Sequence, residues 1–417
     1  MYEKITLKNG VRVVYEHLPY VRSAAMGIWV GIGSANERAA ENGAAHFIEH
    51  MVFKGTSSRS AADIAEQMDA MGGQVNAFTA KECTCFYVRA LGEHISAASE
   101  ILCDMFFNSR FDDADIKNEL GVILEEIGMY KDSPEDLAAD TLLENVFRSS
   151  SLGRPILGKP STIGKMDGAF LKSFMASHYG AKQTVVSLCG CFDDGELKRI
   201  CDRFSAMPAL SVRAPARAAY APAFAVKRKK TDQNHLCIGF PCLSSSDERR
   251  YAVQLMSNIL GGGMSSRLFQ GIREKLGLCY SIYTFTSCYR DTGAFAVYTA
   301  LAPEAEEAAI EAVLKEIRRF REDGVSEDEL ARAREQVKSN VLMGLESTSA
   351  LCSSSGRSEL MLGRVVTADD LIEAYGSVTR EQILSAAREF LDFERLSFSA
   401  VGRVRRAEEY RELLQKC

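Results

Sequence analysis

The sequence contains no apolar run that approaches the roughly 18 residues of a membrane-spanning helix. Its N-terminal segment, MYEKITLKNGVRVVYEHLP, lacks the continuous apolar stretch of a signal peptide. An excess of positive charge is also missing, because the formal net charge is −6, and this argues against a nucleic-acid partner. We therefore expect a cytoplasmic protein with neither a membrane span nor a nucleic-acid ligand.

Cysteine pairs with the C-x₂-C spacing of structural zinc sites are absent from the 12 cysteines. Cys83 and Cys85, like Cys189 and Cys191, are separated by one residue in strand-like text, so each pair shares one strand face. Cysteines without a secretory signal fit a reducing compartment, where most act as small buried apolar residues. These pairs therefore predict packing residues rather than metal ligands.

The length of 417 residues exceeds one ordinary core and suits about two to four domains. Residues 206–230 hold three prolines among small and basic residues without sustained periodicity, which is typical of a linker. The element order before this stretch returns after it, which indicates a duplicated α+β unit. We predict two homologous domains, 1–212 and 231–417, joined by a linker at 213–230. Each is an antiparallel β-sheet with helices packed on one face.

Local signals place the elements of the first domain. Asn42 is a plausible N-cap of a helix that Gly55 ends. Gln74–Thr79 reads as a strand at a sheet edge, and one long helix is expected over 113–147.

The stretch GAAHFIEHMVFKGT carries His46, Glu49 and His50 in the order H-x-x-E-H. A helix advances about 100° per residue, so the imidazoles share one face and the carboxylate lies on the adjoining flank. Two neutral imidazoles at this spacing suit a tetrahedral Zn²⁺, and the carboxylate can take a proton from water. This order is the inverzincin pattern; the alternative is a helix that carries two histidines by coincidence.

A third ligand has to come from another element, because a catalytic zinc usually takes three protein ligands. The helical text NELGVILEEIGMY offers Glu119, Glu125 and Glu126. Glu119 and Glu126 are seven apart and share nearly one face, whereas Glu125 is turned by about 100° toward solvent. One of the aligned pair can bind the metal while the other holds a histidine.

A specific resemblance is carried by three stretches, AAHFIEHMVFKGT, NAFTAKECTCFY and ELGVILEEIGMYKDSPED. They resemble the insulinase–pitrilysin family of zinc peptidases, in particular short members built like the mitochondrial processing peptidase β-subunit. The resemblance covers essentially the whole chain. It implies one Zn²⁺ per chain with Glu126 as the third ligand, Glu119 beside a histidine, and Glu49 as the general base. Leu120 stands where relatives commonly have an arginine.

The resemblance extends into the second half through GGGMSSRLFQGIREKLGLCYSIY. Family members place an arginine and a tyrosine seven residues apart there, which implies catalytic roles for Arg273 and Tyr280. A guanidinium and a phenol can donate hydrogen bonds to a peptide carbonyl and to the oxyanion formed from it. The alternative is a surface arginine and a half-buried strand tyrosine.

The resemblance also implies that Asn76, Ala77 and Phe78 bind substrate along the strand edge. An unpaired edge can bind an extended peptide through main-chain hydrogen bonds. The alternative for each of these three residues is an ordinary strand position.

The sequence as a whole predicts a zinc metalloendopeptidase that hydrolyses short or unfolded polypeptides. Longer family members join four such units, so a two-unit chain implies a dimer. A homodimer that shares Arg273 and Tyr280 between protomers is the economical form. The alternatives are a heterodimer with another gene product and a non-catalytic homologue that binds peptides or scaffolds a complex.

Overall fold

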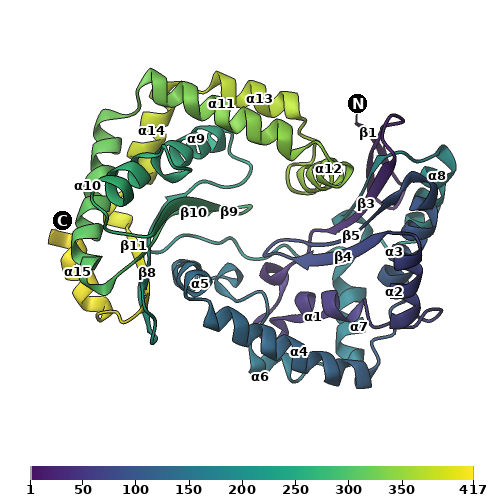
Figure 1. Ribbon diagram of the computed structural model, residues 1–417. Coiled ribbons are helices and arrows are strands. Elements are labelled where there is room, and N and C mark those ends of the chain that lie inside the picture. Colours follow the sequence, from purple (N-terminus) through teal and green to yellow (C-terminus); the bar gives the residue numbers. More distant parts are fainter. Residues whose placement is uncertain (1, 417) are drawn as a thin grey trace. The chain divides into compact units, whose positions relative to one another are not determined.

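The computed structural model describes residues 2–416, and the chain forms two compact units. The first unit comprises Met1–Ile127, Arg154–Ala216 and Leu342–Ala368. The second comprises Gly128–Gly153, Arg217–Val341 and Asp369–Cys417. Each unit is built on one β-sheet with helices, as Figure 1 shows.

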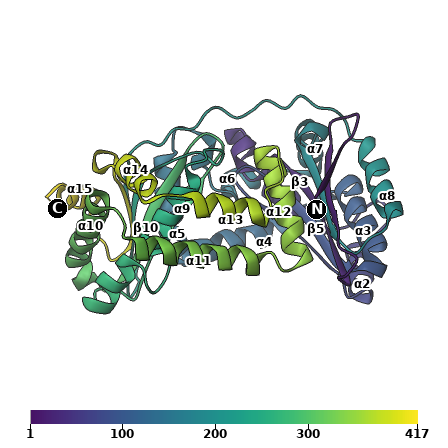
Figure 2. The same cartoon turned by 90° about the horizontal axis from the view of Figure 1, so that it is seen from above.

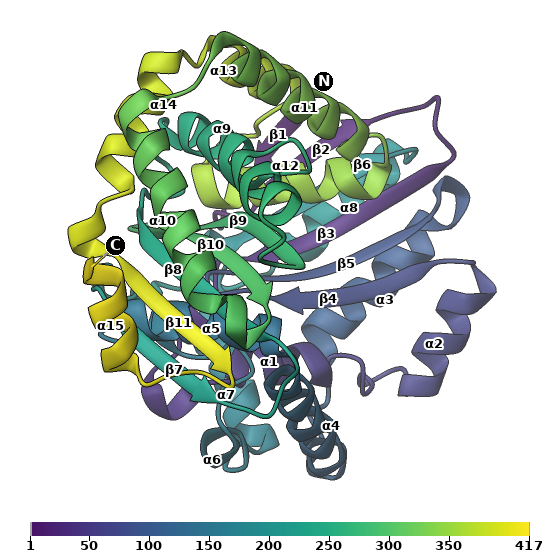
Figure 3. The ribbon, with the colours of Figure 1, turned by 60° about the vertical axis from the view of Figure 1, so that its left-hand side comes forward.

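The first unit contains a six-stranded sheet in the order β1-β2-β6-β3-β5-β4. The pair β2–β6 is parallel, and the other neighbours are antiparallel. Figure 3 shows β3, β5 and β4 side by side, with β4 at the edge. The strands are β1 Glu3–Thr6, β2 Arg12–His17, β3 Ser23–Val30, β4 Gln74–Thr79, β5 Thr84–Leu91 and β6 Thr184–Gly190.

Both faces of this sheet are covered. Alternate residues of β3, such as Met26 and Ile28, join the main core with α1, α3 and α7. The residues between them face α12, where Trp29 packs beside Leu360. Gly356 lets this helix come close, because a Cβ there would lie 2.2 Å from Trp29 Nε1.

The second unit contains a five-stranded sheet in the order β7-β11-β8-β10-β9. Only β7–β11 is parallel among these described strands. Helices α9, α10 and α14 share the core on one face, and α5 contacts β8 and β11 on the other (Figures 1 and 2). The strands are β7 Phe224–Arg228, β8 Asn234–Cys242, β9 Ser281–Cys288, β10 Gly293–Leu301 and β11 Ser397–Gly402.

The units exchange one helix each. Helix α5 follows first-unit segments along the chain but belongs to the second unit, and α12 does the reverse. The predicted domains, 1–212 and 231–417, were each contiguous, so the exchange of α5 and α12 was not predicted. The chain leaves the first unit between Ala216 and Arg217, inside the predicted linker, and β7 occupies residues 224–228 of that linker.

The predicted helix over 113–147 is wrong in one respect, because it is broken into α4 and α5. Pro134 has no N–H and its ring clashes with the preceding turn, so α4 ends at Asp132. Ser133 then caps α5, with its side chain accepting a hydrogen bond from Asp136 N.

The predicted α+β class with two homologous domains is confirmed, but helices lie on both faces of each sheet where one face was predicted. No helix within residues 2–416 is long and apolar enough to cross a membrane. The helices are α1 Ala44–Met51, α2 Ala61–Ala70, α3 Ile95–Asn108, α4 Asp113–Asp132, α5 Pro134–Val146, α6 Pro160–Ile163, α7 Gly168–His178, α8 Asp194–Ser205, α9 Arg250–Gly261, α10 Glu306–Asp323, α11 Glu327–Gly344, α12 Thr348–Leu362, α13 Ala368–Ser377, α14 Arg380–Phe390 and α15 Ala407–Lys416.

Candidate metal centre and active site

Helix α1 starts on a buried carboxylate. Glu37 accepts hydrogen bonds from Gly43 N at 2.8 Å and Ala45 N at 2.9 Å, two N–H groups at the helix start. Asn42 was expected as the N-cap, but Gly43 holds that position with φ 102°, and the Asn42 amide donates to Glu37 instead. Burial raises the Glu37 pKa to about 7. This network fixes the start of the helix that carries the histidines.

The structure brings His46, His50 and Glu126 together. Glu126 Oε2 lies 3.5 Å from His46 Nε2 and 3.3 Å from His50 Nε2. One ligand atom from each residue can be chosen so that all three lie within 4.8 Å of one another. Both histidines come from α1 and Glu126 comes from α4, so all three belong to the first unit.

The donor set fits a cation. Burial and the neighbouring His50 lower the pKa of His46 to about 3, so this imidazole is neutral. Glu126 Oε2 is buried and has no hydrogen-bond partner among the described residues, although two imidazole nitrogens face it. Lone pairs that converge without a proton or a cation repel each other, and two imidazoles with one carboxylate are ligands that Zn²⁺ takes.

Glu119 lies behind His50, as one of the aligned glutamates was expected to do. Its Oε1 is 2.9 Å from His50 Nδ1, so the imidazole N–H donates to the carboxylate and His50 Nε2 is left with its lone pair. Lys54 contacts the other oxygen, with 2.5 Å between Nζ and Oε2. Glu125 is not among the side chains that come together to hold a metal ion, which are His46, His50 and Glu126.

Glu49 is a mostly buried carboxyl on the same helix. Burial raises its pKa, and hydrogen bonding to Thr79 and the nearby His50 partly oppose that rise. The Oε2 atom of Glu49 is buried and has no hydrogen-bond partner among the residues described. A raised pKa makes the ionised carboxyl a stronger base toward a water molecule beside it.

Strand β4 lies at the edge of its sheet and contacts α1. The side chain of Ala77 joins the core, while Asn76 and Phe78 are exposed. The Ala77 N–H donates to the Asn76 side-chain oxygen at 2.8 Å. The three residues thus line a strand whose second edge pairs with no described strand.

Arg273 and Tyr280 come together in the second unit. Arg273 lies in a short π-helix, Phe269–Lys275, and its guanidinium is 4.5 Å from the Phe269 ring centroid and 5.6 Å from that of Tyr280. Tyr280 is 73% exposed, so its hydroxyl is available to a ligand. Tyr280 is therefore not the half-buried tyrosine of the alternative interpretation.

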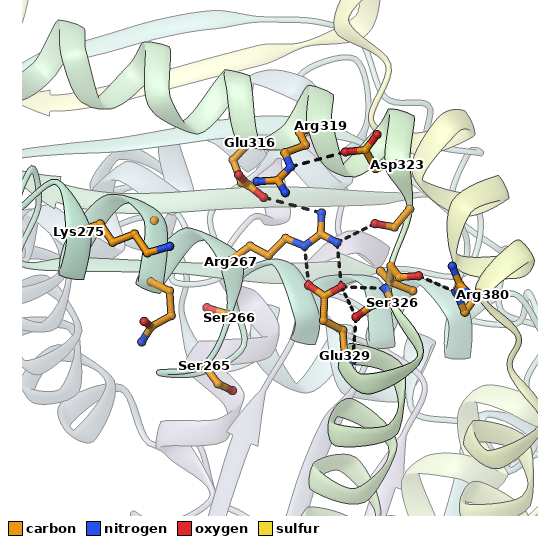
Figure 4. Close-up of a pocket in the computed structure, with 14 residues that line it drawn as sticks. Ser265, Ser266, Arg267, Lys275, Glu316, Arg319, Asp323, Ser326, Glu329 and Arg380 are labelled. Carbon is orange, nitrogen blue, oxygen red and sulfur yellow. Dashed lines mark hydrogen bonds and ion pairs between the residues drawn. The ribbon is translucent and has the colours of Figure 1, made fainter.

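A cavity of about 670 Å³ beside this π-helix is lined by charged residues (Figure 4). Arg267 forms two hydrogen bonds with Glu329, at 2.7 and 2.9 Å, and a third with Gly324 O. Arg319 pairs with Asp323 on the same wall. These charges satisfy one another and tie the start of the π-helix to α10 and α11.

Sequence reasoning missed Glu37 and Lys54. A signal for Lys54 was present, because it follows His50 by four residues, the spacing of one helical turn. Glu37 gave no such signal, since a loop carboxylate seven residues before the helix has no fixed position until the chain folds.

The duplicated sheet units and the His–His–Glu group describe a two-unit protein with a candidate metal centre in its first unit. The family model described as insulinase (peptidase family M16) matches residues 12–160, and the one described as peptidase M16 inactive domain matches residues 165–337. The chain belongs to peptidase family M16, the insulinase family.

Its relatives carry zinc protease names. The chain is 40% identical to the uncharacterized zinc protease YmxG of Bacillus subtilis, over 93% of this chain and 95% of that protein. It is also 40% identical to the uncharacterized zinc protease SCO5738 of Streptomyces coelicolor, over 96% and 89% of the two chains. These similarities support a peptidase.

Two solved structures share the fold. A peptidase M16 inactive domain protein from Pseudomonas fluorescens superposes with a TM-score of 0.90 at 19% identity, over 97% of this chain and 98% of that one. A protease from Helicobacter pylori gives 0.89 at 18% identity, over 96% and 99%. Both confirm the architecture of two duplicated units.

Proposed function

We propose that this chain is a zinc-dependent metalloendopeptidase that hydrolyses short or unfolded polypeptides. The observation that carries the proposal is the convergence of His46, His50 and Glu126, with Glu49 on the same helix. These three residues hold one Zn²⁺ per chain, and Glu49 acts as the general base.

The bound metal supplies Lewis acidity, which makes water a stronger nucleophile at neutral pH. The residues of the chain do the rest. Glu49 accepts a proton from the attacking water and later gives it to the leaving amine. Its buried position supports the first of these transfers, because a raised pKa makes the carboxylate a stronger base toward water. Glu119 holds the ring of His50 through Nδ1.

The substrate lies along β4 as an added antiparallel strand. Main-chain groups of Asn76, Ala77 and Phe78 bind it, which gives affinity with little dependence on side chains. The Asn76 side chain has to release the Ala77 N–H when a peptide carbonyl takes its place, because one N–H donates one strong hydrogen bond.

Arg273 and Tyr280 donate hydrogen bonds to the scissile carbonyl and to the oxyanion that develops from it. We place this pair in a homodimer, where the two residues of one protomer serve the metal site of its partner. The cytoplasmic location remains a prediction of the sequence.

The test is Glu49→Gln, which keeps the side-chain size and removes the base. We expect the variant to bind one Zn²⁺ per chain while cleavage of a quenched peptide falls by at least about 100-fold. Zinc content by atomic emission and turnover by fluorescence measure the two quantities. Normal turnover in this variant would refute the assignment, and zinc binding without cleavage in the unaltered protein would leave a peptide-binding homologue.

Mixing two inactive proteins tests the homodimer. One carries Arg273→Ala with Tyr280→Ala, and the other carries Glu49→Gln. A mixed dimer contains one site with every catalytic group, so activity returns after subunit exchange. Mass measurement of the unaltered protein separates a homodimer from a monomer. No return of activity, once exchange is demonstrated with labelled chains, counts against sharing.

A further inference from the structure

Lys54 lies on the far side of Glu119 from the metal ligands. Its Nζ is 2.5 Å from Glu119 Oε2, while Glu119 Oε1 is 2.9 Å from His50 Nδ1. The carboxylate therefore bridges an ammonium group and an imidazole. One carboxylate oxygen of Glu119 forms an ion pair with the Lys54 ammonium, and the other accepts a hydrogen bond from the ring N–H of His50.

The position of Lys54 follows from the way α1 ends. The helix stops at Met51, and the Lys54 N–H still donates to Met51 O at 3.0 Å, so the chain makes one further turn. Gly55 then changes direction with φ 108°, which a residue with a side chain rarely adopts. Lys54 is thus held one turn past His50, on the side that faces α4.

The burial of the pair shows why its charge matters. The side chain of Glu119 is only 8% exposed, and that of Lys54 is 35% exposed. Among the described residues, Lys54 is the one lysine or arginine that pairs with any of the three carboxyls Glu49, Glu119 and Glu126. A nearly buried carboxylate without a cation partner moves toward water or toward another donor.

We propose that Lys54 is a positioning residue of the metal centre, which holds Glu119 so that His50 presents Nε2 to the metal. This inference rests on the proposed zinc site. Lys54 is not one of the three candidate ligands, and it acts through the Glu119 carboxylate that it contacts. Its ammonium repels a nearby divalent cation, so a purely electrostatic role would weaken zinc binding, whereas a positioning role strengthens it.

The experiment measures zinc affinity by competition with a chromophoric chelator. We expect Lys54→Met to weaken binding by about 10-fold, in the range seen when groups behind metal-bound histidines are lost. Lys54→Arg keeps the charge and is expected to retain most of the affinity. Lys117→Met is the matched control, because Lys117 is an exposed lysine of α4, two residues before Glu119, with no ion pair among the described side chains.

A double-mutant cycle separates positioning from general stabilisation. In a Glu119→Gln background the carboxylate is gone, so Lys54→Met should cause no further loss of zinc affinity. Thermal unfolding of the metal-free proteins is measured beside it, since a merely structural role lowers the melting temperature and leaves affinity unchanged.

The outcomes are distinct. Unaltered protein that binds no zinc overturns the proposed site and this inference together. If it binds zinc, an unchanged or higher affinity in Lys54→Met overturns the positioning role alone, as do additive losses in the cycle. The positioning role is supported if Lys54→Met lowers zinc affinity and Lys54→Arg does not. In the Glu119→Gln background, Lys54→Met should then cause no further loss of affinity.

Discussion

The two units share one strand topology, and among the described residues only the first carries a candidate metal centre. Strands β2, β6, β3, β5 and β4 of the first unit stand in the same order as β7, β11, β8, β10 and β9 of the second, with the parallel pair in the same place. In both units a helix follows the central strand, α1 after β3 and α9 after β8. Five strands and the helix after the central strand are therefore duplicated, and β1 is an addition to the first unit.

The burial of α1 and α9 allows a residue-by-residue comparison. Residues 47–52 and 255–260 show the same sequence of buried and half-buried positions. In this alignment His46, Glu49 and His50 correspond to Gln254, Ser257 and Asn258. Amides and hydroxyls are not the ligands of protein zinc sites, which use thiolate, imidazole and carboxylate. The comparison teaches that the chemistry resides in the side chains of one helix face, not in the fold.

The largest expected effect comes from replacing His46 of α1 by alanine, with Gln254 of α9 as the corresponding position for comparison. His46→Ala removes one of three ligands, so zinc content should fall from about one per chain to near zero and peptide cleavage with it. Gln254→Ala, at the corresponding exposed position of α9, should leave both unchanged. Metal content and cleavage are measured on the same samples. Zinc loss in Gln254→Ala would break the comparison, because it would give α9 a metal-binding role.

A smaller effect concerns the helix that each unit receives from the other half of the chain. Gly356→Ala places a Cβ 2.2 Å from the buried Trp29 Nε1, which should cost about 1–3 kcal/mol of unfolding free energy despite the better helix propensity of alanine. Gly239→Ala meets only the end of the Leu142 side chain, at 2.8 Å, and should cost less. Urea unfolding gives both values. A larger loss in Gly239→Ala would reverse this ranking of the two contacts.

The smallest expected effect is a difference in pH dependence between two contributions to stability, that of Glu37 before α1 and that of Asp247 before α9. Burial raises the pKa of Glu37 to about 7, from 4.5. Between these values the folded state keeps a proton that the unfolded state has released, so the contribution of Glu37 to stability is complete below about 4.5 and is lost as pH rises through 7. Asp247, which precedes α9, has its pKa lowered by its hydrogen bonds to Arg249, so its contribution is instead lost in acid.

Melting temperatures of the metal-free protein and of Glu37→Gln, followed from pH 4 to 8, test this difference. The advantage of the unaltered protein over the variant should shrink as pH rises through the interval. Asp247→Asn serves as the control, since its difference from the unaltered protein should change only at the acid end. A Glu37→Gln difference that grows with pH would contradict the assignment.

Much of the metal centre could be predicted because its first part is local. The spacing of His46, Glu49 and His50 fixes their shared helix face before any tertiary contact forms. Helical spacing also narrowed the third ligand to Glu119 or Glu126, and the family resemblance was needed to choose between them. That choice depends on how α4 packs against α1, which no local pattern encodes.

Other features could not be predicted, because they depend on long-range packing. The ion pair of Lys54 with Glu119 joins residues 65 apart, and the Glu37 carboxylate reaches α1 only after the loop between them folds. The break between α4 and α5 had a visible signal in Ser133 and Pro134, yet the surrounding helical periodicity outweighed it. The destination of α5 on the second sheet had no signal in the sequence.

The exchange of α5 and α12 has a consequence for how the protein can be divided. A fragment cut after residue 216 would retain α5 without the strands it covers, and its own sheet would expose the surface where Trp29 meets α12. The complementary fragment would expose the β8 and β11 surface on which α5 lies. Each half on its own would lack a helix that covers its sheet, so we expect the two fragments to be soluble only when they are produced together.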